Sequence, residues 1–321
     1  DTATTEIYTL SLHDALPIGK LASAGGVTLI LDEYHLASSQ RLHDLVMQFV
    51  RAVPDNVRVV IASRFRGTFP ISTFKAHGNV QEIGPEHLRF TFEEAAAVFD
   101  RSIATGSLQL LFERTEGWPV AIRLARYWIE GRADADDLIR EFSGAAGDVA
   151  VYLTEQIMSG LPQPVQMFML RTAIVDEING DLADEICACS DGWQMLDGLK
   201  PLSAVLVPLP GSSGWFRYHP LFLDYLRGAH KSLGEAQLRQ LHVRAAHWFA
   251  AHERLDTAVE HANEAHDYQL AAEMIERAGG VWIIQRSSAS YLRRLLQPFP
   301  VAEIDRSEEH TSELQSQNRI S

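Results

Sequence analysis

The chain has 321 residues, of which 42 are acidic and 28 are basic, so its formal net charge at pH 7 is −14. This acidity argues against a surface that binds nucleic acid or another polyanion, because phosphate contacts require lysine and arginine side chains. The two cysteines, Cys187 and Cys189, lie two residues apart, and the sequence shows neither a signal peptide nor an apolar run of membrane length. Together these features predict a reduced, cytoplasmic compartment and no membrane contact.

The two ends of the chain resemble translated sequencing-library adaptors rather than protein that evolved to fold. Residues 1–18 are similar to the in-frame translation of a common adaptor, and residues 306–321 are similar to the adaptor from the other end. Neither tail is therefore expected to contribute to the fold. The remaining portion, residues 19–305, is interpreted as an internal part of a longer protein, and its length suits roughly two domains.

The first predicted element is a strand over residues 27–31 that ends on two adjacent carboxylates, Asp32 and Glu33. Its five residues are aliphatic or β-branched, which is typical of a parallel strand buried on both faces. In open α/β sheets, ligands bind at the carboxyl ends of such strands. The arrangement fits a Walker B motif, in which Asp32 holds Mg²⁺ and Glu33 is the catalytic residue that polarises an attacking water. A plain strand end that happens to carry an acid is the alternative.

A βαβ unit follows from the next two predicted elements. Apolar residues at helical spacing predict a helix over residues 42–50, and residues 57–62 read as a second buried strand. A strand, a helix and a strand of this length indicate a parallel sheet. Arg64 then emerges at the same sheet edge as the two carboxylates, where it would sense a γ-phosphate or simply pair with Glu33. Residues 80–83 are a candidate for one more strand.

A phosphate loop is not present at Gly19-Lys20. The motif GxxxxGK[ST] needs a glycine where Ala15 stands and a hydroxyl side chain where Leu21 stands. A loop of this kind, if the protein has one, is expected upstream of the sequence.

From Thr91 onward the pattern is helical. Thr91 and Glu94 have the spacing of a capping box at a helix start. Residues 204–209 and 215–218 predict the two strands of a hairpin, with a further helix opening at His219. Helices followed by such a hairpin resemble a winged-helix module.

Short helices with interleaved alanines occupy the chain beyond Gly234, which suits the start of a helical-repeat (TPR-like) superhelix. The predicted fold class is therefore α/β plus all-α, with a truncated P-loop NTPase parallel sheet, a helical domain, a winged-helix-like module and the first repeat helices. The predicted domains are residues 19–88 for the C-terminal part of the NTPase core, 89–146 for the helical domain, 147–233 for the winged-helix-like domain and 234–305 for the start of the repeats, between the tails at 1–18 and 306–321.

As a set, these stretches resemble the LuxR-family ATP-dependent transcription regulators of the maltose-regulator (MalT-like) type, within the STAND class of switch ATPases. No single stretch is specific, but all occur in the family's order and span about residues 27–278. The matching stretches are LILDEYH, VVIASR, LRFTFEEAAAVF, RTEGWPVAIRLA, VAVYLTEQIMSGLPQPVQMFMLRTAIVDEINGDLADEIC and WFRYHPLFLDYLR.

The resemblance implies roles for individual residues. Asp32 and Glu33 match the Walker B acids, with Asp32 as the Mg²⁺ ligand, and Arg64 matches the sensor arginine. Pro119 matches a proline that packs on the adenine. His219 matches a winged-helix histidine that contacts the ADP β-phosphate. Because a proline follows His219 where the family has a His-Asp type motif, a histidine that caps its own helix is the alternative.

The family implies a switch that binds ATP or ADP with Mg²⁺ and is at most a slow ATPase. An inducer or regulatory protein would bind the repeats, the ATP state would self-associate, and DNA would be read only by a C-terminal helix-turn-helix that this sequence lacks. The predicted function is thus an internal fragment of an inducer-responsive transcription activator. The alternatives are the same switch with a kinase or another effector, and a degenerate helical scaffold.

Overall fold

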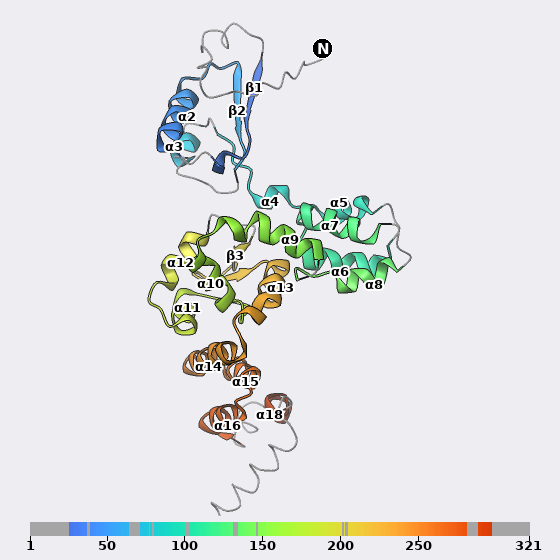
Figure 1. Ribbon diagram of the computed structural model, residues 1–321, viewed down its shortest axis with the longest axis vertical. Coiled ribbons are helices and arrows are strands. Elements are labelled where there is room, and N and C mark those ends of the chain that lie inside the picture. The colour runs from blue at the N-terminus through green and yellow to red at the C-terminus, as the bar shows by residue number, and fades with distance from the viewer. Residues whose placement is uncertain are drawn as a thin grey trace, which may run out of the picture. The chain divides into compact units, whose positions relative to one another are not determined.

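The computed structural model describes residues 26–36, 39–63, 71–76, 78, 80–99, 103–130, 134–145, 147–200, 202, 205–280 and 288–296. The chain forms two compact units, residues 1–82 and residues 83–321, and each is described by itself (Figure 1). Arg64 and both adaptor-like tails lie outside the described residues.

The first unit contains the predicted βαβ arrangement. Strand β1 (Val27–Leu31) pairs in parallel with β2 (Val57–Ile61), with Val27 opposite Val57 and Leu31 opposite Ile61. Helix α2 (Gln40–Ala52) connects them and begins at Ser39, whose hydroxyl accepts a hydrogen bond from the backbone N–H of Leu42 at 3.1 Å. The short helices η1 (Tyr34–Leu36) and α3 (Ile71–Ala76) complete the described part.

The burial predicted for both faces of this sheet is wrong for the described part of the unit. Residues alternate between half-buried and exposed along β1, and the side chains of Ile30 and Val60 are 61% and 41% exposed. Figure 1 shows α2 and α3 on one side of the two strands, so the side chains on that side are the covered ones. Successive side chains of a strand point to opposite faces, and helices on one side therefore cover only every second residue.

The strand expected over residues 80–83 does not form. These residues are irregular and pair with neither of the two-stranded sheets that the described residues contain. A strand needs a neighbouring strand that forms hydrogen bonds with its backbone N–H and C=O groups, and no described strand pairs with these residues.

The second unit begins with a helical segment. Its helices are α4 (Pro85–Leu88), α5 (Phe92–Val98), α6 (Thr105–Thr115), α7 (Pro119–Ile129), α8 (Ala135–Glu141) and α9 (Gly147–Gln156). The capping box at the start of α5 is confirmed: the Glu94 N–H donates to the Thr91 hydroxyl at 3.2 Å, and the Thr91 N–H donates to the Glu94 carboxylate at 2.8 Å. Leu111, Ile122 and Ile139 are at most 1% exposed and form part of the core.

A winged-helix arrangement follows. After η2 (Met158–Gly160) come α10 (Gln163–Thr172), α11 (Gly180–Cys187) and α12 (Gly192–Leu199), then the antiparallel strands β3 (Leu206–Pro208) and β4 (Phe216–Tyr218), and then α13 (Pro220–Gly228). The predicted hairpin is therefore confirmed. An additional bridge pairs Ile178 with Phe216, and the buried hydroxyls of Tyr218 and Thr172 lie 2.7 Å apart, so β4 is tied to α10 and to the turn after it.

The last described helices pack through small residues. After η3 (Ala229–Ser232) these are α14 (Glu235–Ala251), α15 (Leu255–Glu264), α16 (Tyr268–Arg277) and α18 (Ala289–Leu296). The alanines at the helix contacts are fully buried, which allows the helix axes to approach closely; they are Ala245, Ala246, Ala258, Ala262 and Ala271. A longer repeat superhelix stays a prediction.

Gly144 offers a test of how tightly α13 is packed against the turn between α8 and α9. A Cβ atom at Gly144 would lie 1.5 Å from the carbonyl oxygen of Leu221 in α13, so Gly144→Ala requires the backbone to move. We expect a loss of roughly 1 to 3 kcal/mol in the free energy of unfolding, measured by urea denaturation. Gly160→Ala is the matched control, because a Cβ there meets no atom within 4 Å. Equal stability of the two variants would contradict this packing.

Candidate functional site

Asp32 and Glu33 lie where the sequence predicted, at the carboxyl end of β1. Because β1 and β2 run parallel and in register, the ends of both strands meet at one edge. The Ala62 N–H donates to the Leu31 carbonyl at 2.8 Å, and the Tyr34 N–H donates to the Ala62 carbonyl at 3.0 Å. Both carboxylates are exposed at this edge.

The backbone around the two acids has an uncommon conformation. Glu33 adopts a positive φ of 49°, and its N–H donates to the Asp32 carboxylate at 2.8 Å. A left-handed conformation costs a residue with a side chain about 1 to 2 kcal/mol, and such residues cluster at functional sites. One hydrogen bond leaves a carboxylate with further lone pairs, so Asp32 retains the oxygen ligands that Mg²⁺ prefers.

These residues fit a metal ion better than a triphosphate. Asp32 and Glu33 supply the oxygen ligands, whereas GxxxxGK[ST], the loop that surrounds the phosphates with backbone N–H groups, does not occur in the sequence. No step of phosphoryl transfer can therefore be derived from the residues of this edge. The roles of Asp32, Glu33 and Arg64 stay predictions.

The turn from Thr115 to Pro119 is the second place that the sequence singled out, and it lies in the second unit. Helix α6 ends at Thr115, Glu116 and Gly117 have φ values of 46° and 75°, and Pro119 is the first residue of α7. The Gly117 carbonyl accepts from the Phe90 N–H at 2.8 Å, and a Cβ at Gly117 would lie 2.3 Å from the Phe90 carbonyl oxygen. Only glycine fits this position. Proline suits the first helical position because it lacks a backbone N–H, and an N–H at this position would have no helical partner.

His219 lies against this turn and is only 2% exposed. Its Nε2 is 3.1 Å from the Thr115 carbonyl oxygen, which can only accept, so Nε2 carries the proton and donates. The Trp118 ring meets the imidazole edge to face at a centroid distance of 5.4 Å. Burial lowers the pKa of His219 to about 4, although the neighbouring Glu116 carboxylate opposes the shift. The ring is therefore neutral at pH 7.

The alternative of a histidine that caps its own helix is wrong. His219 occupies the N-cap position of α13, but its side chain makes no capping hydrogen bond. The ring instead turns to the carboxyl end of α6, 104 residues away in sequence. With Nε2 as donor, the unprotonated Nδ1 is buried without a hydrogen-bond partner among the described atoms.

Glu116, which sequence reasoning missed, forms ion pairs beside the contact between His219 and α6. Its carboxylate accepts from Arg217 of β4 at 2.7 Å and from Arg89, just after α4, at 3.4 Å. The side chain of Glu116 is 20% exposed, so the pairs are shielded from water. The one available signal was Arg217, which alternates with buried Phe216 and Tyr218 along β4 and so must point away from their side.

Two of the predicted residues, Pro119 and His219, thus lie at one contact between α6 and α13. Trp118, within the turn, packs against the histidine ring there. We call the set Thr115 to Pro119, His219, Arg89 and Arg217 the α6–α13 joint. Asp32 and Glu33 belong to the edge of the other unit.

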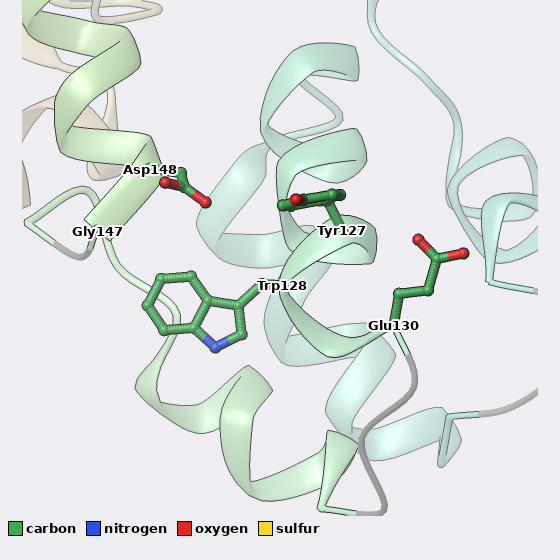
Figure 2. A pocket seen from close by; sticks show the side chains of 5 residues that line it. All are labelled: Tyr127, Trp128, Glu130, Gly147 and Asp148. Carbon is green, nitrogen blue, oxygen red and sulfur yellow. The ribbon is translucent and has the colours of Figure 1, made fainter.

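Two further features were missed. A hollow of about 420 Å³ is lined by Tyr127, Trp128, Glu130, Gly147 and Asp148, and its two carboxylates would repel a phosphate (Figure 2).

The carboxylate of Asp184 lies within 4.8 Å of the possible ligand atoms of Cys189 and Asp191. It accepts from the Gly192 N–H at 2.7 Å and from the Cys189 thiol at 3.4 Å, so it holds the start of α12, and burial raises the pKa of that thiol to about 11.

Comparison with known proteins agrees with this anatomy. Residues 154–239 match the family model described as the MalT winged helix domain, a range that includes α10 to α13 and His219. The winged helix of this chain is therefore similar to that of MalT.

Several longer proteins are similar to most of this chain, at low sequence identity. The HTH-type transcriptional regulator MalT of Vibrio campbellii is 27% identical over 259 residues, which cover 78% of this chain and 28% of that protein. MalT of Klebsiella pneumoniae strain 342 is 26% identical over 279 residues, covering 85% and 31%. The serine/threonine-protein kinase PknK of Mycobacterium tuberculosis H37Rv is 26% identical over 280 residues, covering 86% and 25%. The chain spans about a quarter to a third of the length of these relatives. No helix in the described ranges has both the length and the apolar character needed to cross a membrane.

The Glu116 pairs can be tested by removing one charge without changing shape. In Glu116→Gln, Arg217 loses a shielded partner, and we expect the free energy of unfolding to fall by roughly 1 to 2 kcal/mol. The pKa of His219 should also fall below its wild-type value, because the Glu116 carboxylate raises it, and an NMR titration measures this. Asp197→Asn, which removes the exposed pair with Lys200, is the control and should change little. Equal changes in the free energy of unfolding and in the His219 pKa of the two variants would contradict this role of Glu116.

Proposed function

We propose that this chain is the nucleotide-switch region of an inducer-responsive transcription regulator of the MalT type. The match of residues 154–239 to the MalT winged helix domain is the observation that carries the proposal. The similarity to MalT regulators over most of the chain and the exposed carboxylates at the sheet edge support it.

In this proposal, Asp32 binds Mg²⁺ at the edge of the β1–β2 sheet, and Glu33 orients a water. Arg64 would sense the terminal phosphate, and Pro119 would pack on the adenine ring. The bound ATP or ADP supplies the phosphate charge to which these residues respond. Any hydrolysis would be slow and would serve to reset the switch, because phosphoryl transfer also needs the phosphate loop.

In this proposal, His219 could contact a phosphate only after a change in its protonation or in its hydrogen bond. In the present tautomer Nε2 donates to the Thr115 carbonyl and Nδ1 has no proton, so neither nitrogen is available to donate to a phosphate oxygen. A phosphate contact by His219 requires either proton uptake at Nδ1 or release of Nε2 from Thr115. Release of Nε2 breaks the contact between α6 and α13 and would convert nucleotide binding into movement between the helical and winged-helix segments, whereas proton uptake at Nδ1 keeps that contact and places a positive charge on the buried ring.

The proposal of a MalT-type switch also implies binding partners. A small-molecule inducer or a regulatory protein would bind helical repeats of which α14 to α16 are part, and the ATP state would self-associate. DNA would be contacted by a helix-turn-helix outside the printed sequence, since no basic recognition surface is expected on the winged helix.

A second output is favoured by one observation, the similarity of 86% of this chain to part of the kinase PknK. The same switch region would then regulate a kinase rather than a DNA-binding domain. The sequence of the complete gene distinguishes the two: a helix-turn-helix domain supports the regulator, and a kinase domain supports the alternative. If the complete gene has neither domain and no phosphate loop, the region is a helical scaffold and both proposals fail.

The role of Asp32 can be tested in the protein encoded by the complete gene. Asp32→Ala should abolish Mg²⁺-dependent ATP binding, measured by isothermal titration calorimetry with and without Mg²⁺, because it removes the predicted metal ligand. Asp55→Ala is the control, since Asp55 is also exposed but lies just before β2 at the opposite end of the sheet. Unchanged Mg²⁺-dependent binding by the Asp32→Ala variant would contradict the proposed metal site.

A further inference from the structure

Two buried histidines face each other between α14 and α15. His242 and His261 are 9% and 7% exposed, and their Nδ1 atoms lie 2.9 Å apart. The His261 ring also stacks on Phe249, with a centroid distance of 5.4 Å and an interplanar angle of 6°. Fully buried alanines of both helices pack in the same contact, so the pair lies in an apolar interface.

The hairpin that contains the pair is attached to the winged helix. The Arg244 guanidinium donates to the Ile186 carbonyl of α11 at 3.1 Å, and Trp248 meets Trp215 edge to face at 6.0 Å. Arg254, in the turn between α14 and α15, pairs with Glu177 at 3.8 Å. Arg244 and Trp248 attach α14 itself, whereas the Arg254 pair lies in the turn and depends on α14 and α15 keeping their mutual position.

Only one proton fits between the two Nδ1 atoms. One ring must donate and the other must accept for a 2.9 Å contact to be a hydrogen bond. A proton added to the accepting Nδ1 would place two N–H groups against each other and would leave a positive charge in an apolar contact. A first proton on Nε2 of the donating ring leaves the hydrogen bond in place but puts a positive charge in the apolar contact, and a second proton makes the contact repulsive.

The surrounding charges do not compensate for such a proton. Arg227 of α13, His230 of η3 and Arg254 all disfavour a positive charge, whereas Asp176 favours it at His261. The Asp176 carboxylate is already paired with Arg227 at 2.8 Å. On α16, Glu273 pairs with Arg277, and on α18 Arg294 lies over the Tyr291 ring. The acids of α15 and an exposed acid of α11, which packs against α14, are not among the groups that shift the pKa values of the two histidines; they are Asp256, Glu260, Glu264 and Glu185. Burial, reinforced by these cations, lowers the pKa of His242 to about 3 and of His261 to about 4.

We infer that the facing imidazoles of His242 and His261 form an acid-sensitive joint, which holds α14 to α15 at neutral pH and loosens this hairpin from the winged helix when it takes up protons. Because both pKa values are lower in the folded state than the ordinary value of about 6.5, the pair stabilises the hairpin fully above that pH. The stabilisation is lost as the pH falls from about 6.5 toward 4. This inference stands apart from the proposed nucleotide switch.

Hydrogen exchange measured by mass spectrometry on the whole chain tests the joint. Protection factors of α14 and α15, corrected for the intrinsic pH dependence of exchange, should fall about 10-fold per histidine for each pH unit between pH 6 and pH 5. Those of α11 and α12, which contain no histidine themselves and report on the winged helix that includes buried His219, should fall less. A loss of protection in α14 and α15 no greater than that in α11 and α12 would overturn the inference.

Two variants identify the titrating groups. His261→Phe keeps an aromatic ring against Phe249 but removes the proton site, so it should flatten the pH dependence of α14 and α15. His247→Gln, on the exposed side of α14, should retain the wild-type dependence. A wild-type slope in His261→Phe would refute the assignment, and if that variant does not fold, the comparison of helices within the wild-type chain still decides.

Discussion

The imidazole of His219 donates a buried hydrogen bond to the Thr115 carbonyl, and this contact joins the helical segment of the second unit to its winged helix. The turn that presents the carbonyl can adopt its shape only with glycine at position 117, because the Phe90 carbonyl leaves no room for a Cβ. The same turn directs Glu116 to Arg217 on the hairpin and places Trp118 against the histidine. Helix α13, which begins just after His219, also contacts α6, α9 and α10.

Much of the local structure could be predicted because it depends on residues close in sequence. The parallel strands, the helix between them, the capping box of Thr91 and Glu94 and the β3–β4 hairpin all follow from periodicity and from short spacing rules. The position of Asp32 and Glu33 at the end of β1 follows from the same rules. The exposure of Ile30 and Val60 could not be predicted, since a strand's sequence does not state which elements cover its two faces.

The contacts that define the two joints are long-range. His219 meets Thr115 across 104 residues, and His242 meets His261 across 19, in both cases through packing that no local pattern encodes. Sequence reasoning singled out His219 through a family resemblance, yet assigned its side chain to a phosphate or to a helix cap. The structure shows a third partner, a backbone carbonyl of another helix. The ion pairs of Glu116 gave even less signal, because an exposed-looking charge in a turn is common.

The winged helix occupies a central place in this scheme, since it contacts the helical segment through His219 and the repeat hairpin through Arg244 and Trp215. Its outer helices carry acidic side chains: Asp181 and Glu185 of α11 are exposed, and Asp197 of α12 is paired with Lys200. DNA-reading winged helices present cations to phosphates, and each contact of that kind steepens the salt dependence of binding. We therefore propose that this module connects the segments and does not recognise DNA.

Fluorescence anisotropy with labelled duplex DNA, titrated with the whole chain over a range of salt concentrations, tests that assignment most directly. The acidic surface of α11 and α12 predicts no measurable binding at physiological salt. Sub-micromolar binding, with a salt dependence that corresponds to several phosphate contacts, would contradict the assignment of the winged helix as an internal arm of the switch.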